Sequence, residues 1–191
     1  MNALANDKVG QYVNEHYVST FLKVGTFTVN GANKQGGNVA AYFCLPDGFV
    51  LHAIAGPVGA DAMLKEARWA VDTRKVALFE AQNNANRYKE FFRQAHYERL
   101  LLDGGARSKR GAPVRLGGAG GFPDFPVAAD SGALQRIEQQ LALQGGNVTT
   151  NEQRVHQLLA NYPLVKIERI YKYVFERILN ERVSTLPVVQ K

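Results

Sequence analysis

The sequence predicts an α/β protein in which a buried β-hairpin is flanked by helices. Two almost wholly apolar runs, residues 39–45 and 49–55, are joined by Pro46-Asp47-Gly48, a combination that favours a tight turn. Neither run alternates apolar with polar residues, so both faces of the hairpin should be covered. Residues 60–103 contain neither Gly nor Pro and carry apolar residues at helical spacing, which predicts a helix packed on the sheet.

The segment before the hairpin should hold a helix, a strand and a loop. Asp7 can cap a helix that ends near residue 16 or 17, with Val9 and Val13 on its apolar face. Residues 18–29 are rich in β-branched and aromatic side chains, so we expect a strand there. Residues 30–38 contain three glycines and three asparagines and should form a loop.

After the hairpin we expect one long helix, or two nearly collinear helices, over residues 60–103. The polar stretch QNNAN at residues 82–86 marks a break or a solvated turn. Residues 102–125 show the clearest change of composition in the chain, with many glycines and several basic residues. Loops of this length are uncommon inside compact domains, so a domain boundary is expected here.

Three helices are predicted beyond the glycine-rich connection. Ser131 can cap the first, which should stop at the following glycine pair. Thr150 and Gln153 have capping-box spacing for the second, which should end at residues 161–163. The last should run from residue 164 to about 183 with a broad apolar stripe.

These patterns divide the chain into three parts. Residues 1–102 form a core with a long C-terminal helix, residues 103–130 a glycine-rich basic linker loop, and residues 131–191 a helical extension. The length of 191 residues fits one domain of about 100 to 150 residues with an added segment.

Composition and charge argue against several classes of protein. No run reaches the roughly 18 apolar residues of a membrane-spanning helix, and the first residues lack a secretory pattern. We therefore expect a soluble cytoplasmic protein with no membrane partner, exported only if the native chain extends upstream with a signal. The net charge is +6, but basic residues do not gather with aromatic ones into one motif, so nucleic-acid binding is not expected.

The order of elements resembles the thioredoxin-like superfamily. The residues that carry the resemblance are NEHYV at 14–18, the hairpin VAAYFCLPDGFVLHAIAG at 39–56 and the helix at 60–71. Together they cover about residues 7–72. The resemblance implies a thioredoxin-like sheet with flanking helices, followed here by an α-helical C-terminal extension, and in the family it implies thiol-disulfide chemistry at a CxxC motif.

The family features that this chain lacks leave two hypotheses. The first helix is not preceded by a CxxC motif or by the family's first strand. The chain has no proline before Pro46, so the family's cis-proline is absent, and a loop takes the place of the helix before the hairpin. Either the chain is a degenerate thioredoxin-like module, or it is N-terminally truncated and its CxxC lies upstream of Met1 in the native protein. We prefer the degenerate module.

The candidate sites for chemistry are few. Cys44 is the single cysteine and should be a small apolar filler, and only His52, across the hairpin, could make it a reactive thiol. The four histidines do not occur at metal-binding spacings, so neither a metal nor another cofactor is expected. The run GGAGG at residues 117–121 leads into no helix and should be a linker. The linker offers these candidate anion contacts: Arg107, Lys109, Arg110 and Arg115.

We therefore expect a non-catalytic protein-interaction or structural module. The apolar faces of residues 88–97 and 167–179 exceed what a minimal sheet can bury, which predicts a protein partner or a homodimer through these helical faces. The main alternative is a thiol-disulfide oxidoreductase whose CxxC lies upstream of residue 1. The third hypothesis is a nucleic-acid binder that uses the basic loop.

Overall fold

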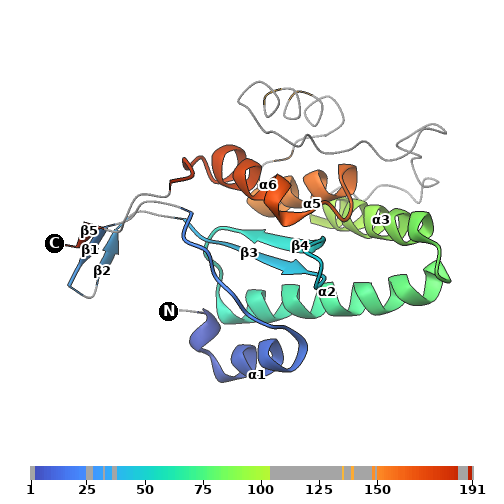
Figure 1. Ribbon diagram of the computed structural model, residues 1–191, viewed down its shortest axis with the longest axis horizontal. Helices are drawn as coiled ribbons and strands as arrows, with labels where there is room; N and C mark the ends of the chain where they lie inside the picture. The colour runs from blue at the N-terminus through green and yellow to red at the C-terminus, as the bar shows by residue number, and fades with distance from the viewer. Residues whose placement is uncertain are drawn as a thin grey trace.

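The computed structural model describes residues 3–24, 28–31, 33–35, 38–103, 148, 150–184 and 189–190, with two isolated positions at 135 and 139. In this part of the chain the protein is mixed α/β, as predicted. A two-stranded hairpin lies between helices, and a second sheet of three very short strands lies apart from it near the C-terminus (Figure 1).

The predicted hairpin is present. Strands β3 (Ala40–Cys44) and β4 (Val50–Ala55) pair antiparallel, and Gly48 in the turn has a φ of +84°, which an L side chain adopts only with strain. Helix α2 lies on one side of the hairpin, and α5 with α6 lies on the other (Figure 1). Coverage of both faces explains why the two runs are apolar throughout.

The hairpin contains a β-bulge that changes which residues face each side. Phe43 pairs with His52 but Cys44 pairs with Val50, so Leu51 has no partner across the ladder. Val50 packs in the cluster formed with α5 and α6, whereas Leu51 packs in the cluster formed with α1, α2 and α3. His52 stacks on Phe43 of the α2 side, so the bulge re-aims two successive side chains toward α2 and α3.

Helix α1 (Asp7–His16) ends where the sequence predicts, but its cap is different. The N-cap residue is Asn6, not Asp7, and its side-chain oxygen accepts hydrogen bonds from the backbone N–H groups of Lys8 and Val9. A short 3-10 turn, Ala3–Ala5, precedes it. The Tyr17 hydroxyl donates to the Ala67 carbonyl at 2.8 Å, which ties the end of α1 to α2.

The strand predicted over residues 18–29 is wrong for most of its length. Residues 17–24 form no strand, and the side chains of Val18, Phe21 and Leu22 are exposed. β-propensity measures the fit to a half-buried sheet surface, and no such surface receives these residues in the described structure. Residues 17–24 therefore do not supply the strand that the thioredoxin-like resemblance places beside the hairpin, and the thioredoxin-like fold stays a prediction.

The second sheet begins where that predicted strand should end. β1 (Thr28–Asn30) pairs antiparallel with β2 (Asn33–Gln35) and parallel with β5 (Val189–Gln190). The loop predicted at residues 30–38 therefore contains a short strand, because the turn at Gly31 brings the chain back alongside β1.

The long helical segment after the hairpin consists of two helices. Helices α2 (Ala60–Ala81) and α3 (Ala85–Asp103) are separated within the predicted polar stretch, which confirms the break. They are not collinear, however, because α3 folds back along α2 (Figure 1). Gln82 and Asn83 have φ of +48° and +63°, and these left-handed residues reverse the direction of the chain.

Helices α5 (Asn151–Asn161) and α6 (Ile167–Tyr173) complete the core around the hairpin. The predicted capping box of Thr150 and Gln153 is present at the start of α5, and the helix ends as predicted. The last helix is shorter than predicted, because α6 continues only as the π-helical turn η2 (Val174–Ile178).

These C-terminal helices are joined directly to the hairpin. The Val50 N–H donates to the Val165 carbonyl at 2.9 Å, and the Ile167 N–H donates to the Gly48 carbonyl at 3.0 Å. Val155 and Leu158 of α5 pack in the same cluster as Val50. What the sequence predicts as an extension thus contributes one wall of the core.

The linker predicted at residues 103–130 lies outside the described residues apart from its first position. So do the four basic residues of the linker and nearly all of the helix predicted from Ser131. Among the helices that the structure does describe, none has both the length and the apolar character needed to cross a bilayer.

Candidate metal centre

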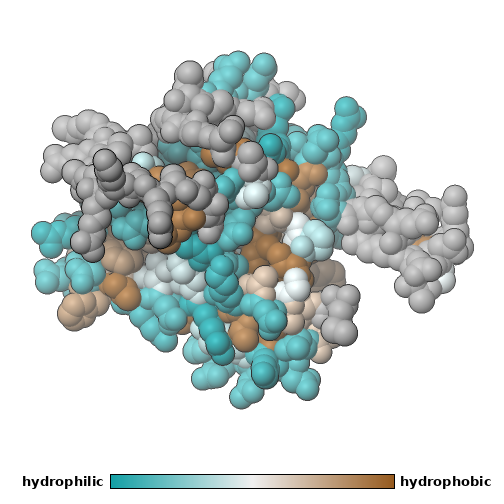
Figure 2. Space-filling model, turned by 180° about the vertical axis from the view of Figure 1, so that it is seen from behind, coloured by the Kyte–Doolittle hydropathy of each residue, from teal (hydrophilic) through white to brown (hydrophobic). Residues whose placement is uncertain are grey.

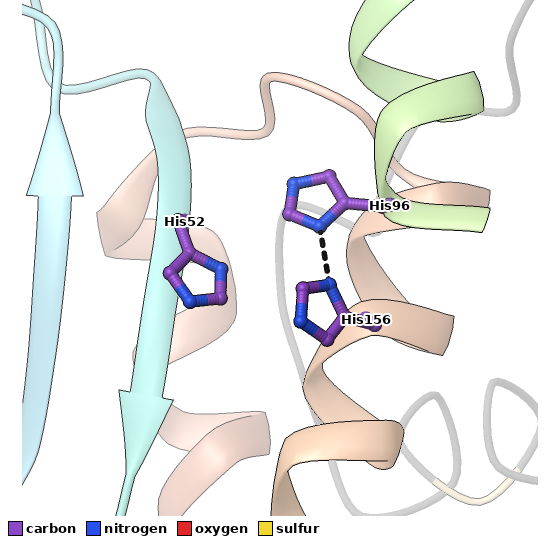
Figure 3. Close-up of side chains that lie close together, drawn as sticks. All are labelled: His52, His96 and His156. Carbon is purple, nitrogen blue, oxygen red and sulfur yellow. Dashed lines mark hydrogen bonds between the residues drawn. The ribbon is translucent and has the colours of Figure 1, made fainter. Parts of the chain in front are cut away.

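Three buried histidines from three separate elements meet between the hairpin and the helices. His52 comes from β4, His96 from α3 and His156 from α5 (Figure 3). Each residue is at most 1% exposed, and one ring nitrogen of each lies within 4.8 Å of those of the other two. The remaining histidine, His16, is exposed on α1.

Local structure explains how each ring reaches this position. The bulge at Leu51 turns His52 toward α2 and α3. His96 follows the buried Phe92 by four residues, so both lie on the inner face of α3. His156 lies on the buried face of α5, whose first turn is fixed by the capping box.

Hydrogen bonds fix which nitrogen of His96 and His156 carries a proton. His96 Nε2 lies 2.9 Å from the Leu51 carbonyl oxygen, which only accepts, so Nε2 must donate. A neutral His96 then has a lone pair on Nδ1, which lies 2.9 Å from His156 Nδ1, so His156 donates from Nδ1. His156 Nε2 is left with a lone pair, and it is buried without a hydrogen-bond partner among the described residues.

The same argument holds for His52. His52 Nε2 lies 3.0 Å from Glu66 Oε2, and the negative carboxylate favours a proton on that nitrogen. The contact is one of ion-pair distance, not a well-aligned hydrogen bond, since Oε2 has no hydrogen-bond partner among the described residues. His52 Nδ1 therefore carries a lone pair, and it too is buried without a partner in the described structure.

All three rings are held in the neutral form. Burial lowers the pKa of His52, and the nearby Glu66 only partly opposes this effect. Burial, together with the neighbouring His52, lowers the pKa of His96 to about 3. Burial and both other histidines also lower the pKa of His156. Neutral imidazole is the form that binds metal ions.

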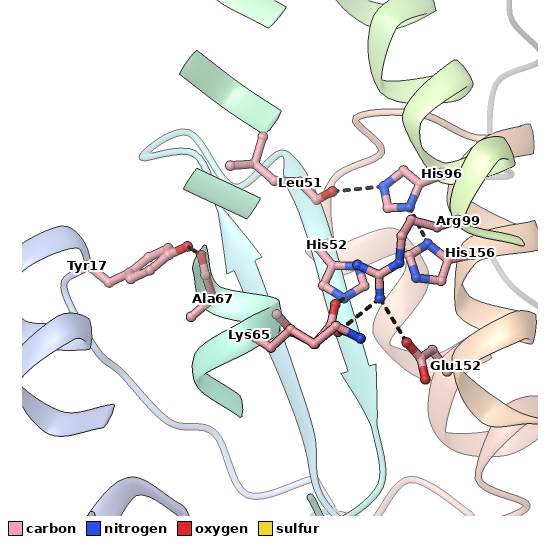
Figure 4. Close-up of polar contacts among 10 residues, drawn as sticks. Tyr17, Leu51, His52, Lys65, Ala67, His96, Arg99, Glu152 and His156 are labelled. Atoms are coloured by element: carbon pink, nitrogen blue, oxygen red, sulfur yellow. Dashed lines mark hydrogen bonds and ion pairs between the residues drawn. The ribbon is translucent and has the colours of Figure 1, made fainter. Parts of the chain in front are cut away.

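A network of charged side chains borders the histidines on one side (Figure 4). Arg99 Nη2 lies 2.9 Å from Glu66 Oε1 and 2.9 Å from Glu152 Oε1. Burial by itself would raise the pKa of Glu66, but the contacts with His52 and Arg99 outweigh it and lower the pKa to about 2. Glu66 is therefore ionised beside His52. A second set of ligand atoms, from Glu66, Glu152 and His156, also lies within 4.8 Å.

Trp69 and Arg99 separate the histidines from a surface pocket. The Trp69 ring lies 5.0 Å from His52, 5.0 Å from His96 and 5.7 Å from His156, measured between ring centroids. The Arg99 guanidinium lies 5.3 Å from the Trp69 centroid. Both side chains also line an open pocket of about 490 Å³, together with Asp61, Leu64, Lys65, Arg68 and Asp72.

The structure does not bring the predicted thiol pair together. Cys44 is opposite Val50, on the side of the hairpin that faces α5 and α6, whereas His52 faces α2 and α3. Burial raises the pKa of the Cys44 thiol to about 11, which disfavours the reactive thiolate. The predicted anion contacts of the linker lie outside the described residues.

The histidine cluster is the feature that spacing in the sequence misses. His96 and His156 are 60 residues apart, so no short motif contains two of the three. The sequence does contain a weaker signal, because each of the three histidines occurs among apolar residues. His52 lies within VLHAIA, His96 follows Phe92 by one helical turn, and His156 follows Val155 directly. A histidine on a buried face needs polar partners, which here are the Glu66 carboxylate, the Leu51 carbonyl and, for His96 and His156, each other.

Comparison with known proteins adds no relationship to this geometry. No protein-family model, no curated protein and no solved structure matches the chain. Function is therefore inferred from the three histidines and the groups that surround them.

Proposed function

We propose that this protein binds a divalent transition-metal ion through His52, His96 and His156. The observation that carries the proposal is a pair of buried lone pairs, on His52 Nδ1 and His156 Nε2, without partners in the described structure. Buried polar atoms without partners are rare in folded proteins and call for an explanation. A metal ion held between the rings accounts for both.

The groups behind the histidines support this proposal. Glu66 lies against the far nitrogen of His52, and the Leu51 carbonyl accepts from the far nitrogen of His96. Metal-binding histidines commonly place their second nitrogen against a carboxylate or a carbonyl in this way, because such a contact fixes the tautomer and the orientation of the ring.

The distances between the nitrogens fit a site that tightens on binding. Zinc lies about 2.0–2.1 Å from imidazole nitrogen, so two nitrogens of a tetrahedral site are about 3.3 Å apart. One nitrogen from each of the three rings lies within 4.8 Å of the other two, so an inward shift would bring them to this spacing. His96 would bind through Nδ1, so the ion would take the place of the hydrogen bond that His156 Nδ1 donates to it. Imidazole donors suit Zn²⁺, Cu²⁺, Ni²⁺ and iron, so we expect an ion from this group.

Tryptophan fluorescence gives a direct test. Trp69 is the only tryptophan of the chain and touches all three rings, so an open-shell ion bound there should quench its emission. Chelator-treated protein should be titrated with Co²⁺, with Zn²⁺ as a competitor. We expect saturable quenching at one ion per chain, reversed by Zn²⁺, with a dissociation constant near or below about 1 μM, or roughly −8 kcal/mol.

Matched variants separate the cluster from other histidines. His156→Asn should lose the quenching, whereas His16→Asn, which changes an exposed histidine on α1, should keep it. Circular dichroism of both variants without metal checks that they are folded. Absence of stoichiometric binding by the folded wild-type protein, or equal loss in both variants, would show the proposal to be wrong.

A protein-interaction role, with a partner or a second copy, is the second candidate. Apolar side chains are exposed among hydrophilic ones on the surface seen in Figure 2. Three of them, Val18, Phe21 and Leu22, lie in the segment between α1 and the second sheet and are 79–99% exposed. A shift from dimer to monomer, or loss of a captured partner, in Phe21→Ser relative to the wild type would support this role. The oxidoreductase and nucleic-acid hypotheses stay predictions.

A further inference from the structure

We infer that the metal ion keeps a fourth coordination position, which takes a water molecule or a small monovalent anion from solution. This inference rests on the proposed metal site. It concerns what that site can do, because a metal with an exchangeable position can bind and polarise a small molecule, whereas a metal fully enclosed by protein ligands is structural.

The count of available ligands is the first argument. A tetrahedral ion needs four ligands, and the cluster supplies three nitrogens. The single cysteine, Cys44, lies on the other side of the hairpin. Glu66 lies against the far nitrogen of His52, and its other oxygen is bound by Arg99. Among the described residues, each oxygen of Glu66 therefore already faces a protonated or positively charged group, Oε2 the His52 Nε2 and Oε1 both Arg99 and Lys65.

The second carboxylate near the cluster is engaged as well. Glu152 Oε1 lies 2.9 Å from Arg99 Nη2, so one guanidinium holds both carboxylates. Glu66, Glu152 and His156 do lie close enough to share an ion. That arrangement would require both carboxylates to leave Arg99, which is already the cation between them.

The sum of charges favours an anion at the open position. A divalent ion with three neutral imidazoles carries +2, and Glu66, Glu152, Arg99 and Lys65 together contribute no net charge, which leaves +2. An uncompensated charge is unfavourable in a site whose three rings are at most 1% exposed. One monovalent anion, such as hydroxide, lowers this charge to +1.

The adjoining pocket provides a place from which such an anion can enter. Three side chains of the pocket lining also reach the centre, because Trp69 packs on the histidines and both Arg99 and Lys65 contact Glu66. The charged residues of its lining are Lys65, Arg68 and Arg99 against Asp61 and Asp72, a net +1. This balance favours small anions at the pocket over cations.

The experiment uses the Co²⁺-loaded full chain and azide. Tetrahedral Co²⁺ has visible absorption bands that shift when a ligand is replaced. We expect azide to shift these bands saturably at one anion per metal, with no shift from perchlorate at the same ionic strength. Stoichiometric Co²⁺ binding with no azide response would overturn this inference and leave the metal site standing. No Co²⁺ binding would overturn the metal site itself.

A variant of the exposed carboxylate tests the main competing ligand set. The Glu152 side chain is 48% exposed, so Glu152→Gln should fold. If the fourth position is open, the azide response of Glu152→Gln should match that of the wild type within about twofold. If azide shifts the Co²⁺ bands of Glu152→Gln but not those of the wild-type protein, Glu152 is the fourth ligand and the inference is wrong.

Discussion

His96 Nδ1 and His156 Nδ1 lie 2.9 Å apart in the core, and the Leu51 carbonyl on the other side of His96 decides which of them holds the proton. That carbonyl belongs to the residue that the bulge leaves without a partner in the ladder. An irregularity of one residue in the hairpin therefore sets the protonation pattern of His96 and His156. It also leaves the lone pairs of His52 and His156 facing no partner in the described residues.

The first prediction concerns these tautomers. In the metal-free protein, long-range ¹H–¹⁵N correlation spectra should show protons on Nε2 of His52, on Nε2 of His96 and on Nδ1 of His156. The reason is that a carboxylate and a carbonyl can only accept from the first two rings. The exposed His16 provides an internal reference. A proton found on His156 Nε2 would contradict the assignment.

Acid should destabilise the metal-free protein through the same rings. Burial lowers the pKa of His96 from 6.5 to about 3, so below pH 6.5 protons bind the unfolded chain more readily than the fold. The stabilisation is therefore complete above about pH 6.5 and is lost as the pH falls toward 3. His96 should contribute a slope that approaches about 1.4 kcal/mol per pH unit within that window, and the lowered pKa values of His52 and His156 act in the same direction.

Glu66 adds a second acid-sensitive contribution at lower pH. Although burial opposes it, the contacts with His52 and Arg99 lower the pKa of Glu66 from 4.5 to about 2. The stabilisation from Glu66 is therefore present above pH 4.5 and is lost as the pH falls toward 2.

Urea denaturation at pH 7.5, 6.5 and 5.5 measures the contribution of the buried histidines, and His16→Asn should show the wild-type slope. A free energy of unfolding that stays constant between pH 7.5 and 5.5 would be the contrary result.

Glu66 should act on metal affinity through His52. Glu66→Gln keeps the size of the side chain beside His52 Nε2 but removes its negative charge, so Co²⁺ affinity should fall about 10- to 100-fold. Glu152→Gln is the matched control, since Glu152 shares Arg99 with Glu66 but lacks the His52 contact, and its affinity should change much less. Equal losses in both variants would point to general electrostatics instead of orientation of His52.

The capping box should stabilise helix α5, which carries His156 of the metal site. Thr150→Ala removes the side-chain oxygen that accepts from the Gln153 N–H and should lower the free energy of unfolding by about 1 kcal/mol. Thr150→Ser keeps the oxygen and should remain within about 0.5 kcal/mol of the wild type. Thermal denaturation of both metal-free variants is the measurement, and an undisturbed Thr150→Ala would show that the cap does not stabilise α5.

The sequence by itself determined those features that depend on neighbouring residues. Gly48 marks the hairpin turn, Thr150 and Gln153 mark the start of α5, and the polar stretch at 82–86 marks a helix break. Each of these depends on backbone conformation or on hydrogen bonds across three or four residues, so local patterns are sufficient. The sequence located the break but did not predict that α3 turns back along α2, because polar residues alone do not indicate the left-handed φ of Gln82 and Asn83.

Only the tertiary structure decided what depends on residues far apart in the chain. Residues 18–24 have strand propensity but form no strand, since a strand also needs an edge to pair with and a surface to cover. The three histidines come together because the bulge, the reversal between α2 and α3, and the packing of α5 on the hairpin each direct one ring to the same place. No spacing in the sequence records that convergence, because it is produced by packing between elements.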